Sequence, residues 1–136
     1  ACERRKTQNA PLVSAARTAL VRRLIVVFQP HRYTRTQQLM NEFGPALEQA
    51  DEIVLADIYP AGEEPIVGVT VEALAAAIHR TAPKLPVRIA RRFDDVIPEV
   101  LKVVKAGDAV ITLGAGSVGT LPRRLIDAFK RGEASA

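Results

Sequence analysis

Short aliphatic runs alternate with segments of helical periodicity, and this alternation constrains the fold more than any other feature of the sequence. The first run, residues 24–28 (LIVVF), contains no polar residue, as expected of a strand covered on both faces. Three further strands are predicted over 52–58, 86–90 and 108–114. Strands separated by helices favour parallel pairing with right-handed crossovers. The sequence therefore predicts a three-layer, Rossmann-like α/β fold with a mostly parallel sheet and helices on both faces.

The segments between the runs carry apolar residues at helical spacing. Val71, Leu74, Ala75 and Ile78 recur at i, i+3, i+4 and i+7, and Thr70 before them is a candidate N-cap. Further helices are predicted over 11–23, 35–50, 94–104 and 120–131.

Two of these helices carry more specific expectations. Gly44-Pro45 should kink or split the helix over 35–50, because proline cannot donate a backbone hydrogen bond. In the closing helix, the spacing predicts a buried face made of Leu121, Leu125, Ala128 and Phe129.

The composition fits one domain over residues 1–136, with 1–11 as a divergent or disordered N-terminal segment. Hydrophobic residues make up 48% of the chain but aromatic residues only 4%, so the core must be aliphatic. One cysteine, Cys2, excludes an internal disulfide and suits a reducing, cytoplasmic compartment. No apolar run reaches the roughly 18 residues that span a membrane. The chain begins with Ala rather than Met, so we expect it to be part of a longer protein.

The charge balance is mildly basic, with a net charge of +4. This permits anionic partners but does not argue for nucleic acid, because the arginine pairs at 22–23, 91–92 and 123–124 lack interleaved aromatic residues. We interpret these pairs, and the acidic pair Glu63-Glu64, as solvated surface. His31 and His79 do not have the spacing of metal ligands, so no metal site is expected.

Basic and aromatic residues follow the first predicted strand directly, in the segment QPHRYTRT. In open α/β sheets, ligands bind where strands end and helices begin. Arg32 and Arg35 are three residues apart, so one helical turn would bring their guanidinium groups to one face, where they could grip a carboxylate or phosphate. Thr34 and Gln37 have the spacing of a capping box, and free N–H groups at the helix start would add to an anion site. In the alternative interpretation, this arginine loop (29–35) is only a turn, and its Arg and Tyr side chains are exposed without binding a ligand.

A second loop, LGAGSVGTL, follows the fourth strand and matches G-x-G-x-x-G through Gly114, Gly116 and Gly119. It is the last βα unit, and no later strand supplies the acidic residue that a dinucleotide ribose needs. Thr120 stands where a P-loop requires Lys, which argues against that motif. We interpret this glycine loop (114–119) as a structural turn that lets the backbone approach a ligand or another domain.

Three segments, VVFQPHRYTRT, DEIVLADIYPAGEEPI and DAVITLGAGSVGTL, resemble in order and spacing the C-terminal domain of the Mur ligases. The similarity is to the members that join L-alanine to UDP-N-acetylmuramate, and it covers about residues 12–130. The resemblance implies the third domain of a cytoplasmic ligase of peptidoglycan synthesis, cell shape and cell division. It maps amino-acid binding onto His31, Arg32 and Arg35, with Tyr33 beside them, and places no catalytic residue in this chain.

The resemblance further implies that ATP phosphorylates the lactyl carboxylate of UDP-N-acetylmuramate, after which the alanine amine attacks the acyl phosphate. The ATP and Mg²⁺ are held mainly by a central domain, and the sugar nucleotide by an N-terminal domain. Since this chain has no complete P-loop, we expect it to be inactive alone. Residues 2–11 match no family motif. The alternatives are a stand-alone anion- or nucleotide-binding α/β module and a basic nucleic-acid-binding domain.

Overall fold

The computed structural model describes residue 13, residues 23–114 and residues 116–131. The predictions for the N-terminal segment 1–11, and for the helix over 11–23 apart from its residues 13 and 23, lie outside the described residues. Val13 is fully buried and belongs to the hydrophobic core. None of the described helices is both long enough and apolar enough to cross a membrane.

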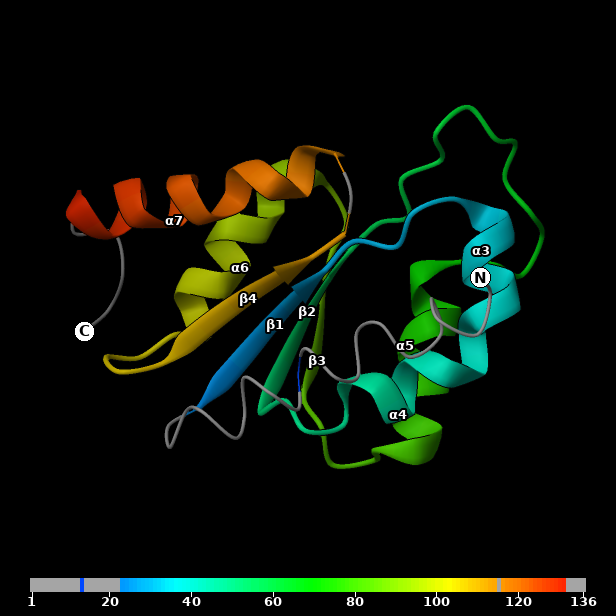
Figure 1. Ribbon diagram of the computed structural model, residues 1–136, viewed down its shortest axis with the longest axis horizontal. Coiled ribbons are helices and arrows are strands. Elements are labelled where there is room, and N and C mark those ends of the chain that lie inside the picture. The colour runs from blue at the N-terminus through cyan, green and yellow to red at the C-terminus, as the bar shows by residue number, and fades with distance from the viewer. Residues whose placement is uncertain (1–12, 14–22, 115, 132–136) are drawn as a thin grey trace.

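The described strands form a single parallel sheet (Figure 1). The strands are β1 (Leu24–Phe28), β2 (Glu52–Ala56), β3 (Val87–Ala90) and β4 (Ala109–Leu113), in the spatial order β3-β2-β1-β4. Val26 pairs with Ile53 of β2 and with Ile111 of β4, so β1 has a parallel neighbour on each side. The predicted parallel α/β fold is confirmed.

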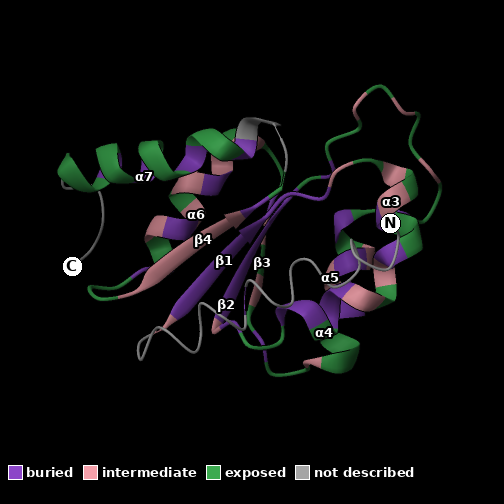
Figure 2. Cartoon of the chain, in the orientation of Figure 1, coloured by how far each residue is buried: buried purple, intermediate pink, exposed green. Residues whose placement is uncertain are grey.

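Helices cover both faces of the sheet (Figure 1). One face carries α3 (Tyr33–Leu39), α4 (Phe43–Leu47) and α5 (Val71–Thr81), and the other carries α6 (Val96–Val103) and α7 (Leu121–Lys130). Side chains alternate between the two faces along β1. Val26 and Phe28 join the core under α3, α4 and α5, whereas Ile25 and Val27 join the core under α6 and α7. Figure 2 shows β1 buried along its whole length.

The helix predicted over 35–50 is interrupted, but upstream of Gly44-Pro45. A 3₁₀ segment, η1 (Met40–Glu42), separates α3 from α4, and Pro45 itself lies inside α4. The reason is that a proline leaves the carbonyl four residues earlier, on Asn41, without its helical partner and clashes with it. The predicted N-cap of α5 is confirmed, because Thr70 Oγ1 accepts a hydrogen bond from Ala73 N at 3.1 Å.

Two expectations about side-chain burial are wrong. Phe129 is 42% exposed, whereas Leu121, Leu125 and Ala128 are buried. At 100° per residue, Phe129 lies about 80° around the helix from Leu121, at the margin of the buried stripe. Arg23, expected on a solvated face, is half-buried and forms ion pairs.

The ion pairs of Arg23 belong to a network at the amino ends of the strands. Arg23 lies 3.2 Å from the buried carboxylate of Glu52 and 3.8 Å from that of Asp108. Arg88 of β3 contacts the other oxygen of Glu52 at 3.2 Å. Because these residues precede or begin different strands, the network ties the strands together at the edge opposite the two predicted loops.

Helices α4 and α5 touch at Gly44, where a methyl group would collide with Thr81 Oγ1. That hydroxyl donates a hydrogen bond to Ile78 O at 3.2 Å. We expect Gly44→Ala to lower the free energy of unfolding by about 1–3 kcal/mol through overpacking, measured by urea denaturation. Adding Thr81→Ala should recover most of the loss. Gly119→Ala is the control, because a methyl group there meets nothing within 4 Å. Equal stability of all variants would show that the two helices separate freely.

Candidate functional site

The arginine loop and the glycine loop lie at the same edge of the sheet, as the parallel topology predicts (Figure 1). The arginine loop leaves the carboxyl end of β1, and the glycine loop leaves the carboxyl end of its neighbour β4. Gln29 N donates to Leu113 O at 3.0 Å and joins the two loops at their base. The chain proceeds from β1 to β3 in one direction and returns to β4 on the other side of β1. This is a topological switch point, where open α/β sheets bind ligands.

The glycine loop makes a close turn over β1. Gly114 has φ +142°, and a methyl group on it would lie 2.8 Å from Gln29 O and 3.1 Å from a Val118 methyl group. Only glycine satisfies both conditions, which supports the interpretation of this residue as a structural turn. The 3₁₀ segment η3 (Gly116–Thr120) then leads into α7, while Ala115 lies outside the described residues. Gly119 has open space around it.

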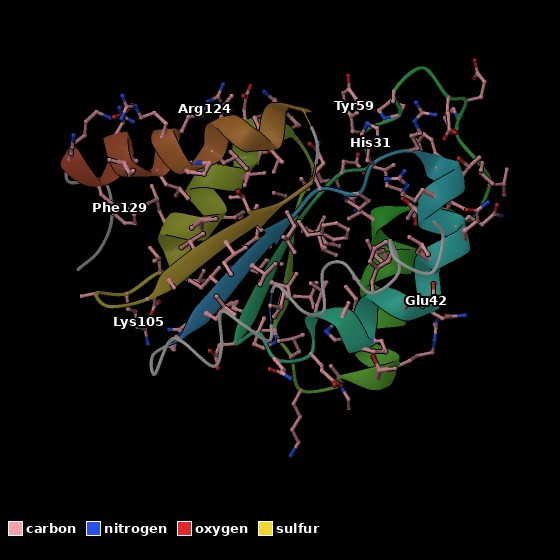
Figure 3. All side chains as sticks on the ribbon, in the orientation of Figure 1. His31, Glu42, Tyr59, Lys105, Arg124 and Phe129 are labelled. Carbon is pink, nitrogen blue, oxygen red and sulfur yellow. The ribbon has the colours of Figure 1, made fainter. Side chains whose placement is uncertain are left out.

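The start of the arginine loop is paired with the loop that follows β2. Arg32 N donates to Tyr59 O at 2.8 Å, and Tyr59 N donates to Pro30 O at 2.9 Å. The half-buried ring of His31 stacks on the ring of Tyr59, with centroids 5.5 Å apart (Figure 3). Tyr59 was not predicted as a site residue. Its position just past the end of β2 is the signal that could have identified it.

Arg32 has an unusual backbone conformation, with φ 73° and ψ 142°. This region is disfavoured for any residue with a side chain. Hydrogen bonds hold the residue on both sides, because its carbonyl accepts from Thr36 N at 3.1 Å and from Thr36 Oγ1 at 2.7 Å, while its N–H is bound to Tyr59. The strain is thus imposed by the surrounding loop and falls on a residue that the sequence nominates for binding.

The predicted capping box at Thr34 and Gln37 is wrong. Arg32 is the N-cap of α3, Thr34 lies within the helix, and the cap comes from the distant loop between β2 and α5. Glu63 accepts from Thr34 N at 3.1 Å and from Thr34 Oγ1 at 2.6 Å. The hydroxyl hydrogen bond is the main cause that lowers the pKa of Glu63, and the backbone N–H groups and Arg32 lower it further. Glu63 is therefore not merely solvated, and it already accepts from N–H groups at the start of α3 that were expected to serve an anion.

The two arginine side chains remain available. Within the described part of the chain, neither guanidinium group donates a hydrogen bond or forms an ion pair, although Arg32 is close enough to Glu63 to interact with its charge. Arg32 is exposed, and Arg35, like Tyr33 at the start of α3, is half-buried. The arrangement leaves two unpaired cations on a rigid edge of the sheet, which suits an anionic ligand.

Gln29, which was not predicted as a site residue, lies at the base of the same edge and is 8% exposed. Its Nε2 donates a long hydrogen bond of 3.4 Å to Asp57 O, whereas Oε1 is buried without a partner among the described residues. A buried polar atom after a strand end is not visible in sequence, because burial depends on the glycine loop above it. The described residues contain no group of three or more His, Cys, Asp or Glu that could hold a metal ion.

A parallel sheet with helices on both faces and a switch point beside β1 defines a Rossmann-like α/β domain. The sequence pattern of the family described as "Mur ligase, glutamate ligase domain" matches residues 8–116. The chain belongs to this family.

Relatives with curated names agree with this assignment. Two proteins called UDP-N-acetylmuramate–L-alanine ligase, from Geotalea daltonii and Syntrophus aciditrophicus, are each 46% identical to the chain. The similarity covers 91% and 95% of the chain but 27% of each relative. The chain thus spans about a quarter of the length of the curated relatives that it matches.

Solved structures support the fold. A murein peptide ligase from Psychrobacter arcticus has a TM-score of 0.71 at 21% identity, over 94% of the chain and 26% of that protein. A ligase domain from Haemophilus ducreyi has a TM-score of 0.62 at 16% identity, over 90% of the chain and 82% of that domain. At these identities the likeness establishes the fold alone.

The strain at Arg32 gives a prediction about stability. Arg32→Gly should be more stable than Arg32→Ala by about 1–3 kcal/mol, because glycine adopts this backbone conformation freely. Both variants remove the guanidinium group, so their difference isolates the backbone. Chemical denaturation of the two proteins measures it. Equal midpoints and slopes would show that Arg32 is not strained.

The cap at Glu63 gives a prediction about pH. Thr34→Val removes the hydroxyl hydrogen bond and should raise the pKa of Glu63 toward its ordinary value, while Thr34→Ser should keep it low. NMR titration of the Glu63 carboxyl carbon measures this pKa. Because the folded-state pKa is lowered, the cap stabilises above the unfolded value of roughly 4.3 and is lost as the pH falls through the folded value. An unchanged pKa in Thr34→Val would assign the shift to other groups.

Proposed function

We propose that this chain is the amino-acid-binding domain of an ATP-dependent ligase that joins L-alanine to UDP-N-acetylmuramate in cytoplasmic peptidoglycan synthesis. Family membership and the names of the relatives support this proposal. The observation that carries it is that Arg32 and Arg35 at the switch point have guanidinium groups with no hydrogen bond or ion pair to the residues that the structure describes. Because peptidoglycan forms the cell wall, the proposed reaction would contribute to cell shape and cell division.

The two arginines would hold the carboxylate of the incoming alanine. A guanidinium group offers two parallel N–H donors that match a carboxylate, and it stays charged at every physiological pH. Holding the carboxylate leaves the amine free to act as the nucleophile. His31 and Tyr33 flank the pair, with His31 fixed against Tyr59 by stacking. The orientation of the amine relative to the activated carboxyl group is then set by rigid elements, which is a large part of catalysis in bimolecular reactions.

We propose that the phosphates of ATP and the Mg²⁺ ion are held mainly outside this chain. Thr120 stands at the position of the P-loop lysine, and the described residues offer no acidic cluster for a divalent cation. We therefore assign ATP, Mg²⁺ and the sugar nucleotide to other domains of a longer polypeptide, and we propose that the isolated chain is inactive. An upstream P-loop in the complete open reading frame would favour this proposal over a stand-alone anion- or nucleotide-binding module.

The carboxylate clamp can be tested in the full-length ligase. Arg32→Lys and Arg35→Lys should each raise the KM for alanine roughly 10- to 150-fold, because lysine keeps the charge but loses the paired hydrogen bonds. The KM for ATP should change little. Steady-state kinetics with alanine varied at saturating ATP measures the effect.

Arg124→Lys is the matched control, because Arg124 lies on α7 (Figure 3). Its guanidinium carbon is 5.4 Å from the centroid of the Phe93 ring, and the group lies near Asp94. The substitution should leave both constants unchanged. If the Arg32 and Arg35 variants keep the alanine KM within about twofold, these side chains do not hold the carboxylate.

A further inference from the structure

The side-chain NH₂ group of Gln29 has a hydrogen-bond partner, whereas its side-chain oxygen has none among the described residues. Its orientation is fixed, because only the NH₂ group can donate to Asp57 O, and a flipped amide would place two oxygen atoms against each other. Oε1 is then the atom that has no partner among the described residues, in a side chain that is 8% exposed. Leaving a buried acceptor unpaired is costly, and such atoms in folded proteins call for a specific explanation.

The position of Gln29 places this acceptor at the switch point. Ile25 and Val27 face α6 and α7, and strand alternation continues this direction to Gln29. Gly114 packs against the Gln29 backbone, and a methyl group on Gly114 would lie 3.5 Å from Gln29 Cβ. The amide therefore lies between the carboxyl ends of β2 and β4, beneath the glycine loop and at the base of the arginine loop.

We propose that Gln29 Oε1 accepts a hydrogen bond from the amine of the amino acid whose carboxylate Arg32 and Arg35 hold. This inference rests on the proposed function and adds a residue for the second polar group of the substrate. An amide oxygen can only accept, so its ligand must carry an N–H or O–H group. In an L-alanine held by its carboxylate, the amine is the one remaining donor.

An amide also suits the chemistry better than a carboxylate would. The amine must lose a proton before its lone pair can attack the activated carboxyl group. A neighbouring carboxylate would stabilise the ammonium form and raise the pKa of the amine, whereas a neutral amide orients the N–H without adding a negative charge. Gln29 thus aims the nucleophile and leaves it able to lose its proton.

The first test uses the full-length ligase and a ligand that lacks the amine. In Gln29→Met, the KM for alanine should rise roughly 10- to 150-fold, the effect of losing a hydrogen bond to a charged group. The inhibition constant of propionate, which has the carboxylate and methyl group but no amine, should stay within about twofold. Gln38→Met is the matched control, because Gln38 is exposed on α3, and it should change neither constant.

The comparison separates this inference from the proposed function. Arg35→Lys should weaken alanine and propionate alike, and a failure of that variant to do so would contradict the carboxylate clamp. Equal weakening of the two ligands in Gln29→Met, or no weakening of either, would overturn the role of Oε1. A purely structural role of Gln29 predicts equal weakening.

Gln29→Glu provides a second test that does not depend on propionate. A carboxylate beside the amine should move the acidic limb of the kcat–pH profile to higher pH by roughly 1–3 units, because the bound amine would hold its proton more tightly. A lower kcat with an unmoved limb would mean that residue 29 does not contact the amine and would overturn the inference.

Discussion

The burial of β1 on both faces and along both edges is the constraint on which the rest of the structure depends. A strand with parallel neighbours on each side must be followed by a crossover helix, and the order β3-β2-β1-β4 makes the chain change direction beside it. The loops after β1 and β4 are therefore forced together. This placement follows from aliphatic residues such as Val26 and Val27, which make no chemical contribution to the site but fix where it lies.

The two edges of the sheet are used in opposite ways. At the amino edge, Arg23, Glu52 and Arg88 satisfy one another's charges. At the carboxyl edge, Arg32 adopts a disfavoured backbone conformation, and Gln29 buries an acceptor that has no partner in the described part of the chain. Binding sites commonly keep such unfavourable features, and the surrounding structure compensates for them. We propose that these features mark the edge where a ligand binds, while the ion pairs at the opposite edge join the strands.

The sequence predicts features that depend on local periodicity and fails where distant residues meet. The strands, their parallel pairing and the Thr70 cap follow from patterns within a few residues of one another. The Glu63 cap does not, because its partner Thr34 is 29 residues away, whereas the local spacing of Thr34 and Gln37 suggested a capping box that the structure does not form. The helix break was expected at Pro45, but the missing hydrogen bond acts four residues earlier. Phe129 departs from expectation because apolar character alone does not define the edge of a buried stripe.

The cap by Glu63 also determines how the site can distinguish its ligands. Because Glu63 already accepts from Thr34 at the start of α3, an anion bound as proposed would be held by the side chains of Arg32 and Arg35 and not by the N–H group of Thr34. Helix N–H groups accept many anions, whereas a pair of guanidinium forks favours planar oxyanions of matching width. The negative charge of Glu63, which interacts with Arg32, lowers the positive potential that any incoming anion would meet. In the proposed site, the fork geometry of the guanidinium groups would favour a carboxylate, and the neutral acceptor of Gln29 would recognise the amine of a zwitterion without adding a second negative charge.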